Sequence, residues 1–173
     1  PALKTVDCGG TAVGNAALVT LPPCLEELDV GCCSGITAAA SFAHLPALKT
    51  VNCCSTAVSD AALATLPPCL EVLDVDSCSG ITAAASFAHL PALKTVICGS
   101  TAVGDAALAT LPLCLEMLHL GSCRGITAVA SFAHLTALKS LYCDNIGVGD
   151  AALATLPPGL EELDVDGCSG VTA

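Results

Sequence analysis

Apolar residues recur along the chain in a short and faithfully repeated pattern. In the segment LEELDVGCCSGIT, residues 25–37, Leu25, Leu28 and Val30 are separated by polar positions. The same pattern returns from Leu70, Leu115 and Leu160. Alternation with a period of two predicts a short strand with Leu28 and Val30 facing inward. The alanine- and leucine-rich stretches that follow, such as AAASFAHL and AALATL, predict one or two helical turns that end at LP or LPP.

The whole chain consists of this pattern at a fixed period. PALKTV begins at Pro1, Pro46 and Pro91, and TALKSL begins at Thr136, so the period is 45 residues without an insertion. Each period divides into 22 and 23 residues with the same placement of leucines, which gives eight units, the last one incomplete. We therefore expect one right-handed α/β solenoid over residues 1–173, with a parallel sheet on its inner face. No polar cap is visible at either end, so we expect a fragment of a longer protein whose uncapped ends self-associate.

Small polar residues stand where the predicted helices begin. Thr37 and the pair Ser59-Asp60 occupy these positions, and we expect them to cap the helix starts.

The repeats resemble a known family. Second half-units such as LDVDSCSGIT are similar to the leucine-rich repeat pattern L-x-x-L-x-L-x-x-C-x-x-I-T of the cysteine-containing class, common in F-box substrate receptors. First half-units such as LKTVNCCSTAVSDAALATLP resemble the variant L-x-x-L-x-L-x-x-T-x-V-x-D-x-x-L. The resemblance covers the whole chain and implies a horseshoe with short helices on its convex side.

The resemblance also implies a structural ladder inside the coils. In the family, the side chain eight residues after the framework leucine bonds backbone groups of the turn. Here that position holds Cys33, Cys78, Cys123 and Cys168, alternating with Thr11, Thr56 and Thr101. Ile146 interrupts the series, and we expect Asn145 to supply the polar contact instead.

The thirteen cysteines fall mostly in two registers, at this ladder and at inward strand positions such as Cys8 and Cys53. Like cysteines recur every second coil, about 10 Å apart, whereas a disulfide needs Cα atoms within about 4.4–6.8 Å. We therefore predict free, reduced cysteines and an intracellular, cytoplasmic protein, with a surface or secreted location as the alternative. No C-x-x-C pair accompanies a matching histidine set, so we expect no metal and no cofactor.

Charge narrows the range of partners. The formal net charge is −11, and the few cations leave nothing to neutralise nucleic-acid phosphates, so we exclude nucleic acid and anionic membranes. The uncharged stretch 77–93 is interrupted by Gly80 and Pro91 and belongs to the repeat, so we expect no membrane insertion. One position in each unit carries Lys4, Glu26, Lys49, Glu71, Lys94, Glu116, Lys139 and Glu161 in turn, which predicts an alternating charge ladder along one rim.

No residue pattern indicates an enzyme. His44, His89 and His134 recur in SFAHL without a suitable partner, so we interpret them as packing at a helix C-terminus. Catalytic motifs are missing from the sequence, and no catalytic residue is predicted.

The copies differ mostly at outward positions of the strands or directly after them. Concave faces of solenoids are the usual binding surfaces, so we predict a protein or peptide partner, basic because the face is acidic. The predicted partner-binding residues are Asp7, Glu27, Asp29, Asn52, Val72, Asp74, Asp76, Ile97, Met117, His119, Tyr142, Asp144, Glu162, Asp164 and Asp166. Alternatives are a substrate-recognition segment of an F-box-type ubiquitin ligase or regulatory scaffold, and a repetitive structural or surface-antigen array. Calcium on the acidic cluster is a lesser alternative.

Overall fold

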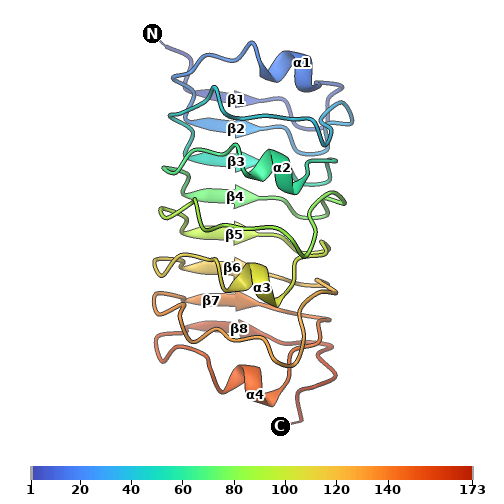
Figure 1. The fold of residues 1–173 in the computed structure, drawn as a ribbon, viewed down its shortest axis with the longest axis vertical. Coiled ribbons are helices and arrows are strands. Elements are labelled where there is room, and N and C mark those ends of the chain that lie inside the picture. The colour runs from blue at the N-terminus through green and yellow to red at the C-terminus, as the bar shows by residue number, and fades with distance from the viewer. Residues whose placement is uncertain (1, 173) are drawn as a thin grey trace.

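Eight short parallel strands form the spine of the protein. The computed structural model describes residues 2–172, and Figure 1 shows them as a ladder with the two ends of the chain at opposite ends. The strands pair in chain order within one sheet. They are β1 (Thr5–Asp7), β2 (Glu27–Asp29), β3 (Thr50–Asn52), β4 (Val72–Asp74), β5 (Thr95–Ile97), β6 (Met117–His119), β7 (Ser140–Tyr142) and β8 (Glu162–Asp164).

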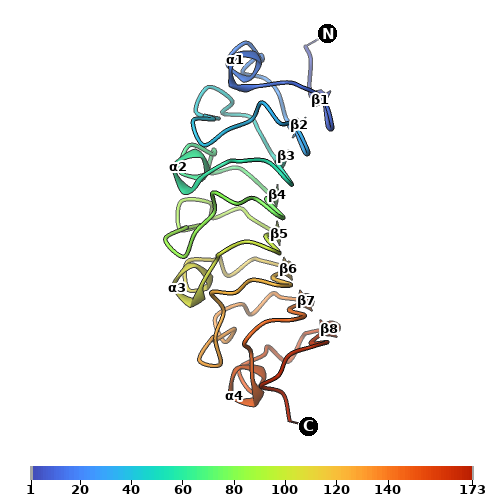
Figure 2. The same ribbon diagram turned by 90° about the vertical axis from the view of Figure 1, so that its right-hand side faces the viewer.

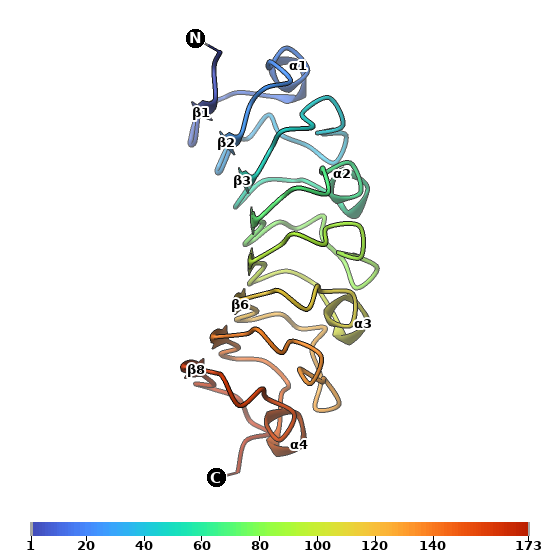
Figure 3. The ribbon, with the colours of Figure 1, turned by 90° about the vertical axis from the view of Figure 1, so that its left-hand side faces the viewer.

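The sheet lines the inner side of a shallow arc. Figures 2 and 3 show the strands along the inside of the curve and the helices along its outside. The middle residue of each strand faces the interior, and Leu28, Val51 and Leu73 are buried completely. Leu3 and Leu163, in the first and last coils, are 52% and 41% exposed because a coil covers them on one side only. The predicted self-association of these ends stays a prediction.

Within residues 2–172, four helices of four residues each lie on the convex side, and only in the first half-units. They are α1 (Asn15–Leu18), α2 (Asp60–Leu63), α3 (Asp105–Leu108) and α4 (Asp150–Leu153). The helix predicted for AAASFAHL is wrong, because this segment forms consecutive turns such as Ala40 N–H to Thr37 O. Ala40, Phe42 and Leu45 all face the core, and a spacing of two residues would place Ala40 and Phe42 on opposite sides of a helix.

The predicted helix caps are also wrong. Ser59 precedes α2 but makes no side-chain cap, and its hydroxyl donates to the carbonyl oxygen of Ala38 in the preceding coil. Asp60 accepts hydrogen bonds from the backbone and hydroxyl of Thr82 in the next coil. Thr37 begins no helix, and its N–H donates to the side chain of Asn15. These residues therefore form hydrogen bonds with neighbouring coils and do not cap helix termini.

The rim charges form a cluster followed by two pairs. Lys4 and Lys49 both contact Glu26, at 2.5 and 2.7 Å, and together lower the pKa of Glu26 to about 2. The other contacts are Lys94–Glu71 at 2.6 Å and Lys139–Glu116 at 2.5 Å. Among residues 2–172, Glu161 forms no ion pair, so the predicted ladder is not continuous.

The ladder inside the coils is built on one carbonyl oxygen in each pair of units. The oxygens of Cys8, Cys53 and Cys98 each accept a threonine hydroxyl and a cysteine thiol. The thiols are those of Cys33, Cys78 and Cys123, each at 3.0 Å. At Ile146 only the Cys168 thiol remains, 2.9 Å from the Cys143 oxygen. The substitute role expected for Asn145 is wrong, because its side chain turns to Asp144.

Two of the three repeated histidines contact helix ends, but those of the preceding coil, whereas the Nε2 atom of His134 is buried without a hydrogen-bond partner. The Nε2 atom of His44 lies 2.8 Å from the oxygen of Leu18, the last residue of α1. His89 makes the same contact with Leu63, the last residue of α2, at 3.1 Å. The carbonyl oxygens at a helix C-terminus lack partners within the helix, and the histidines satisfy one of them.

Candidate binding surface

Strand register places the outward side chains in three parallel columns. Thr5 lies beside Glu27 and Asp7 beside Asp29, and the same matching continues to β8. The first column is Thr5, Glu27, Thr50, Val72, Thr95, Met117, Ser140 and Glu162. The second is Asp7, Asp29, Asn52, Asp74, Ile97, His119, Tyr142 and Asp164. The third, one step past the strands, is Gly9, Gly31, Cys54, Asp76, Gly99, Gly121, Asp144 and Asp166.

All the predicted partner-binding residues lie in these columns and are exposed or partly buried. The columns contain acidic, polar and apolar residues and no lysine or arginine. The structure thus brings the predicted residues onto one face, and their partner-binding role stays a prediction.

Most residues of the second column stabilise the turn that follows their strand, a role that the sequence analysis missed. At five strand ends an Asp or Asn side-chain oxygen accepts the N–H of the residue two positions later, at 2.8–3.0 Å. These residues are Asp7, Asp29, Asn52, Asp74 and Asp164. Each therefore has one oxygen occupied by the backbone, and partial burial raises the pKa of Asp74. A signal was available in the recurring D-V-D and D-x-G strings, which are typical of side chains that bond their own turn.

Three adjacent strands lack this bond. At the same position β5 carries Ile97, β6 carries His119 and β7 carries Tyr142. Together with Met117 they line an apolar hollow of about 430 Å³ on the concave face. The rings of His119 and Tyr142 are 5.9 Å apart and tilted by 56°. The centre of the surface is therefore apolar and aromatic, whereas both ends are acidic.

Carboxylates flank the imidazole of His119. Its Nδ1 lies 3.9 Å from Asp76 Oδ1 and its Nε2 lies 3.8 Å from Asp144 Oδ1. These distances exceed hydrogen-bond length, and Nδ1 is buried without a hydrogen-bond partner. Gly99 makes room for the ring, because a Cβ there would lie 2.8 Å from His119 Cε1. A larger residue at Gly99 would displace the ring.

The hydroxyl of Tyr142 is held at the edge of the hollow. It donates to Glu162 Oε2 at 2.5 Å, and this hydrogen bond raises the pKa of Tyr142. The phenol therefore stays protonated at physiological pH, and its ring presents a fixed apolar face.

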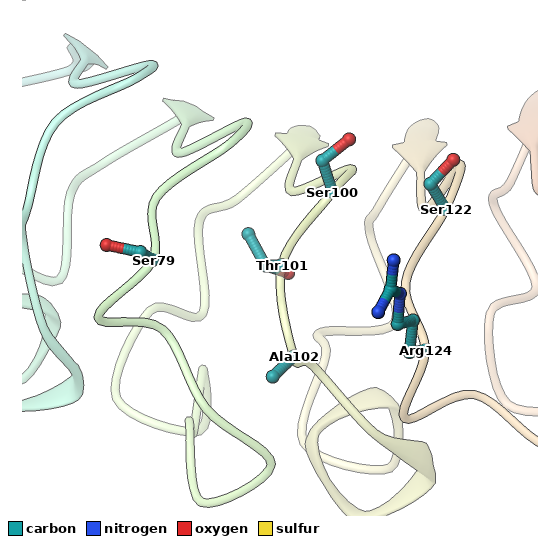
Figure 4. A pocket seen from close by; sticks show the side chains of 6 residues that line it. All are labelled: Ser79, Ser100, Thr101, Ala102, Ser122 and Arg124. Atoms are coloured by element: carbon teal, nitrogen blue, oxygen red, sulfur yellow. The ribbon is translucent and has the colours of Figure 1, made fainter.

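A second hollow, of about 350 Å³, lies on the flank beyond the strand ends. Figure 4 shows the hydroxyls of Ser100 and Ser122 pointing to the same side, with the guanidinium of Arg124 below Ser122. No sequence pattern connects these three residues. A guanidinium is a donor with a positive charge, and the concave columns contain no lysine or arginine, so this flank differs from them in charge.

Within residues 2–172 no three His, Cys, Asp or Glu side chains converge on a possible metal position. Over the same residues, no helix is long and apolar enough to cross a bilayer.

No family model matches the chain, and no curated protein matches it in sequence. Three similar solved structures are internalins of Listeria monocytogenes. Internalin inlF is 18% identical with a TM-score of 0.66, over 98% of this chain and 56% of that one. The functional domain of InlJ, described as including a cysteine ladder, is 17% identical with a TM-score of 0.51, over 96% and 44%. Internalin C2 is 17% identical with a TM-score of 0.58, over 81% and 72%.

The chain thus spans 56% and 44% of the first two internalin structures. At such low identity the likeness concerns the fold alone. Together with the parallel sheet on the inner face, it confirms the predicted fold class, a leucine-rich repeat solenoid.

Proposed function

We propose that the protein is a non-catalytic binding module that holds a basic protein or peptide on its concave face. The observation that carries this proposal is the replacement of a turn-stabilising Asp or Asn by Ile97, His119 and Tyr142 on three adjacent strands. The other five strands keep that residue and its backbone bond. Places where a regular protein departs from its own local rule are commonly functional, because another role compensates for the lost stability.

The chemistry of the surface defines the partner. An apolar and aromatic hollow surrounded by carboxylates favours an apolar anchor residue with lysine or arginine beside it. Met117 and Tyr142 are the contacts for the anchor, and Asp76, Asp144 and Glu162 are the contacts for the cations. Charge complementarity speeds the encounter and depends on salt.

The finer assignments come from the sequence. The similarity to F-box receptors rests on the repeat pattern, and no family model extends it. The intracellular location is inferred from the free cysteines, and a surface or secreted location is its alternative. The repetitive structural or surface-antigen array is the alternative to the binding module. Neither is supported by a particular site in the structure.

Selection from a random peptide library tests the proposal with a defined probe. We expect selected peptides to carry Lys or Arg next to an apolar or aromatic residue. The double variant Met117→Ala/Tyr142→Ala should weaken their binding roughly 30-fold or more, as the loss of about 2 kcal/mol at an aromatic anchor implies. Thermal unfolding should stay close to that of the wild type, since both side chains face outward.

The matched control removes two exposed apolar side chains outside the columns. Leu113 and Val129 are 64% and 83% exposed, and Leu113→Ala/Val129→Ala should bind the selected peptides as the wild type does. Peptides without cationic residues, or peptides that bind the Met117→Ala/Tyr142→Ala variant unchanged, would contradict the proposal.

A further inference from the structure

Cys32 and Cys54 meet at the surface across the boundary between two adjacent coils. β2 pairs with β3 so that Asp29 lies beside Asn52. The pairing continues past the strand ends, where the N–H of Cys32 donates to the carbonyl oxygen of Cys54 at 2.7 Å. Cys32 is exposed and Cys54 is partly buried, and both thiols are free.

The side chain of Cys54 leans toward the coil that carries Cys32. A Cβ added at Gly31 would lie 2.9 Å from Cys54 Sγ, so the sulfur sits above the residue that directly precedes Cys32. Burial is the main cause that raises the pKa of Cys54 to about 11, and the nearby Cys32 thiol contributes to it. The Cys54 sulfur thus lies above Gly31, next to Cys32, and the backbones of Cys32 and Cys54 are hydrogen-bonded to each other.

The backbone spacing suits a disulfide. In the continued register Cys32 lies one residue away from the position opposite Cys54. Cys32 lies in a left-handed turn with φ 57°. Its backbone nitrogen is 2.7 Å from the Cys54 oxygen, and the N–Cα, C–O and Cα–C bond lengths on either side of this contact keep the two Cα atoms roughly 6 Å apart. Disulfides span Cα distances of about 4.4–6.8 Å. Cysteines at equivalent positions recur only in every second coil, which is too far for a disulfide. Cys32 and Cys54 occupy different positions in adjacent coils, so that limit does not apply to them.

Among the residues that the structure describes, such a cysteine pair occurs once. Equivalent contacts in the other copies are made by Ser77 with Gly99 and by Ser122 with Asp144. Cys32 and Cys54 thus both depart from their copies, and the two changes fall on a single contact.

We propose that Cys32 and Cys54 form a redox-responsive site that low-molecular-weight disulfides oxidise to a disulfide between adjacent coils. The exposed Cys32 thiolate attacks the reagent RSSR, forms a Cys32–SR mixed disulfide and releases one thiolate. Cys54 then loses its proton to water, and its sulfur displaces the second thiolate from Cys32. Two protein thiols are oxidised and one RSSR is reduced to two RSH, so atoms and electrons balance.

Peptide mapping after treatment with oxidised glutathione tests this proposal on the 173-residue chain. The folded protein is incubated with the reagent at about pH 8, where exposed thiols are partly ionised, and remaining thiols are alkylated before digestion. We expect a linked Cys32–Cys54 peptide pair, two hydrogens lighter than the reduced pair and separated by dithiothreitol. The exposed Cys69 and Cys114 act as internal controls, because glutathione should modify them without forming this link.

The repeat itself supplies two matched variants. Cys54→Gly copies Gly99, and its Cys32 should accumulate the glutathione mixed disulfide, because no second thiol displaces it. Cys32→Ser copies Ser77, and its Cys54 should stay mostly reduced, because burial keeps that thiol protonated. Circular dichroism checks that both variants fold.

Three results would overturn the site. They are mixed disulfides on both cysteines of the wild type without a link, a Cys32–Cys33 link instead, and an unmodified Cys32 in Cys54→Gly while Cys69 and Cys114 react.

Discussion

Gly80 occupies a place where two coils approach closely, and an alanine there should destabilise the fold. A Cβ at this position would lie 2.4 Å from the carbonyl oxygen of Val58 and 3.1 Å from its carbon. Gly80 forms an isolated parallel bridge with Ser59 in the preceding coil. On its other side, Ala102 N–H donates to the oxygen of Ile81 at 3.2 Å. The backbone on both sides is therefore fixed, and the clash has no flexible side chain to displace.

The magnitude follows from two opposing effects. Relief of the contact needs the coils to separate by roughly 1 Å, and overpacking of this kind costs about 1–3 kcal/mol. Replacing glycine by alanine also restricts the unfolded chain, which returns about 0.4–1 kcal/mol. We expect a net loss of about 1–2 kcal/mol in the free energy of unfolding. For a chain of this size that lowers the melting temperature by about 2–8 °C.

Urea unfolding followed by circular dichroism measures the change, with Gly104→Ser as the control. Gly104 stands where another copy carries Ser59, and its added Cβ would lie 3.1 Å from the oxygen of Gly125. The control should remain within about 0.5 kcal/mol of the wild type. If Gly80→Ala unfolds at the same urea concentration as the wild type, or if both variants lose equal stability, the argument from close approach is refuted.

Three further predictions concern side chains that bond across coils. Glu26 should titrate near pH 2 in carboxyl NMR spectra. Because its pKa is lowered in the folded state, its contribution to stability is present above about pH 4.5 and is lost as the pH falls toward 2. Titration near pH 4.5 would contradict the contact with Lys4 and Lys49. Asp105 bonds Thr127 in the next coil, and Asp105→Ala should lower the free energy of unfolding by about 1.5–3 kcal/mol. Asp105→Asn should keep most of this stability, since Asn15 bonds Thr37 in the same way. Equal losses for the two variants in chemical denaturation would refute this. Thr101→Val should cost only about 1 kcal/mol in the same assay, because the carbonyl oxygen it leaves still accepts a thiol, and a loss above 3 kcal/mol would show that the thiol does not compensate.

Positions within a strand were predictable from the sequence. A period of two fixes which side chains face inward, and an unbroken repeat period forces equivalent residues of adjacent coils into register. Leu28 and Val30 are buried and Asp29 faces outward for this reason. Because register follows from the repeat alone, the predicted surface residues lie in columns although no side-chain contact was known.

Contacts between unlike positions were not predictable in the same way. Asp60 was interpreted as a helix cap, but its partner Thr82 lies 22 residues later in the next coil. Cys32 and Cys54 belong to neither of the two cysteine registers, and their contact depends on how two different columns of adjacent coils overlap. Local patterns contain no information about such diagonal contacts, because the offset between coils depends on the turns that connect them.

Contacts between adjacent coils alone explain why three strands at the centre of the surface tolerate the loss of the turn-stabilising Asp or Asn. In a solenoid each coil touches only the coils beside it, so the cost of a lost bond stays local. Asp74 and Asp164 keep their backbone bonds on either side of the hollow, and the strands between them bury Val96, Leu118 and Leu141 as the others do. Ile97, His119 and Tyr142 can therefore give up the turn-stabilising acceptor without disturbing the lattice. Three adjacent losses on one face are explained by a common role more simply than by independent drift, since drift has no reason to choose neighbouring strands.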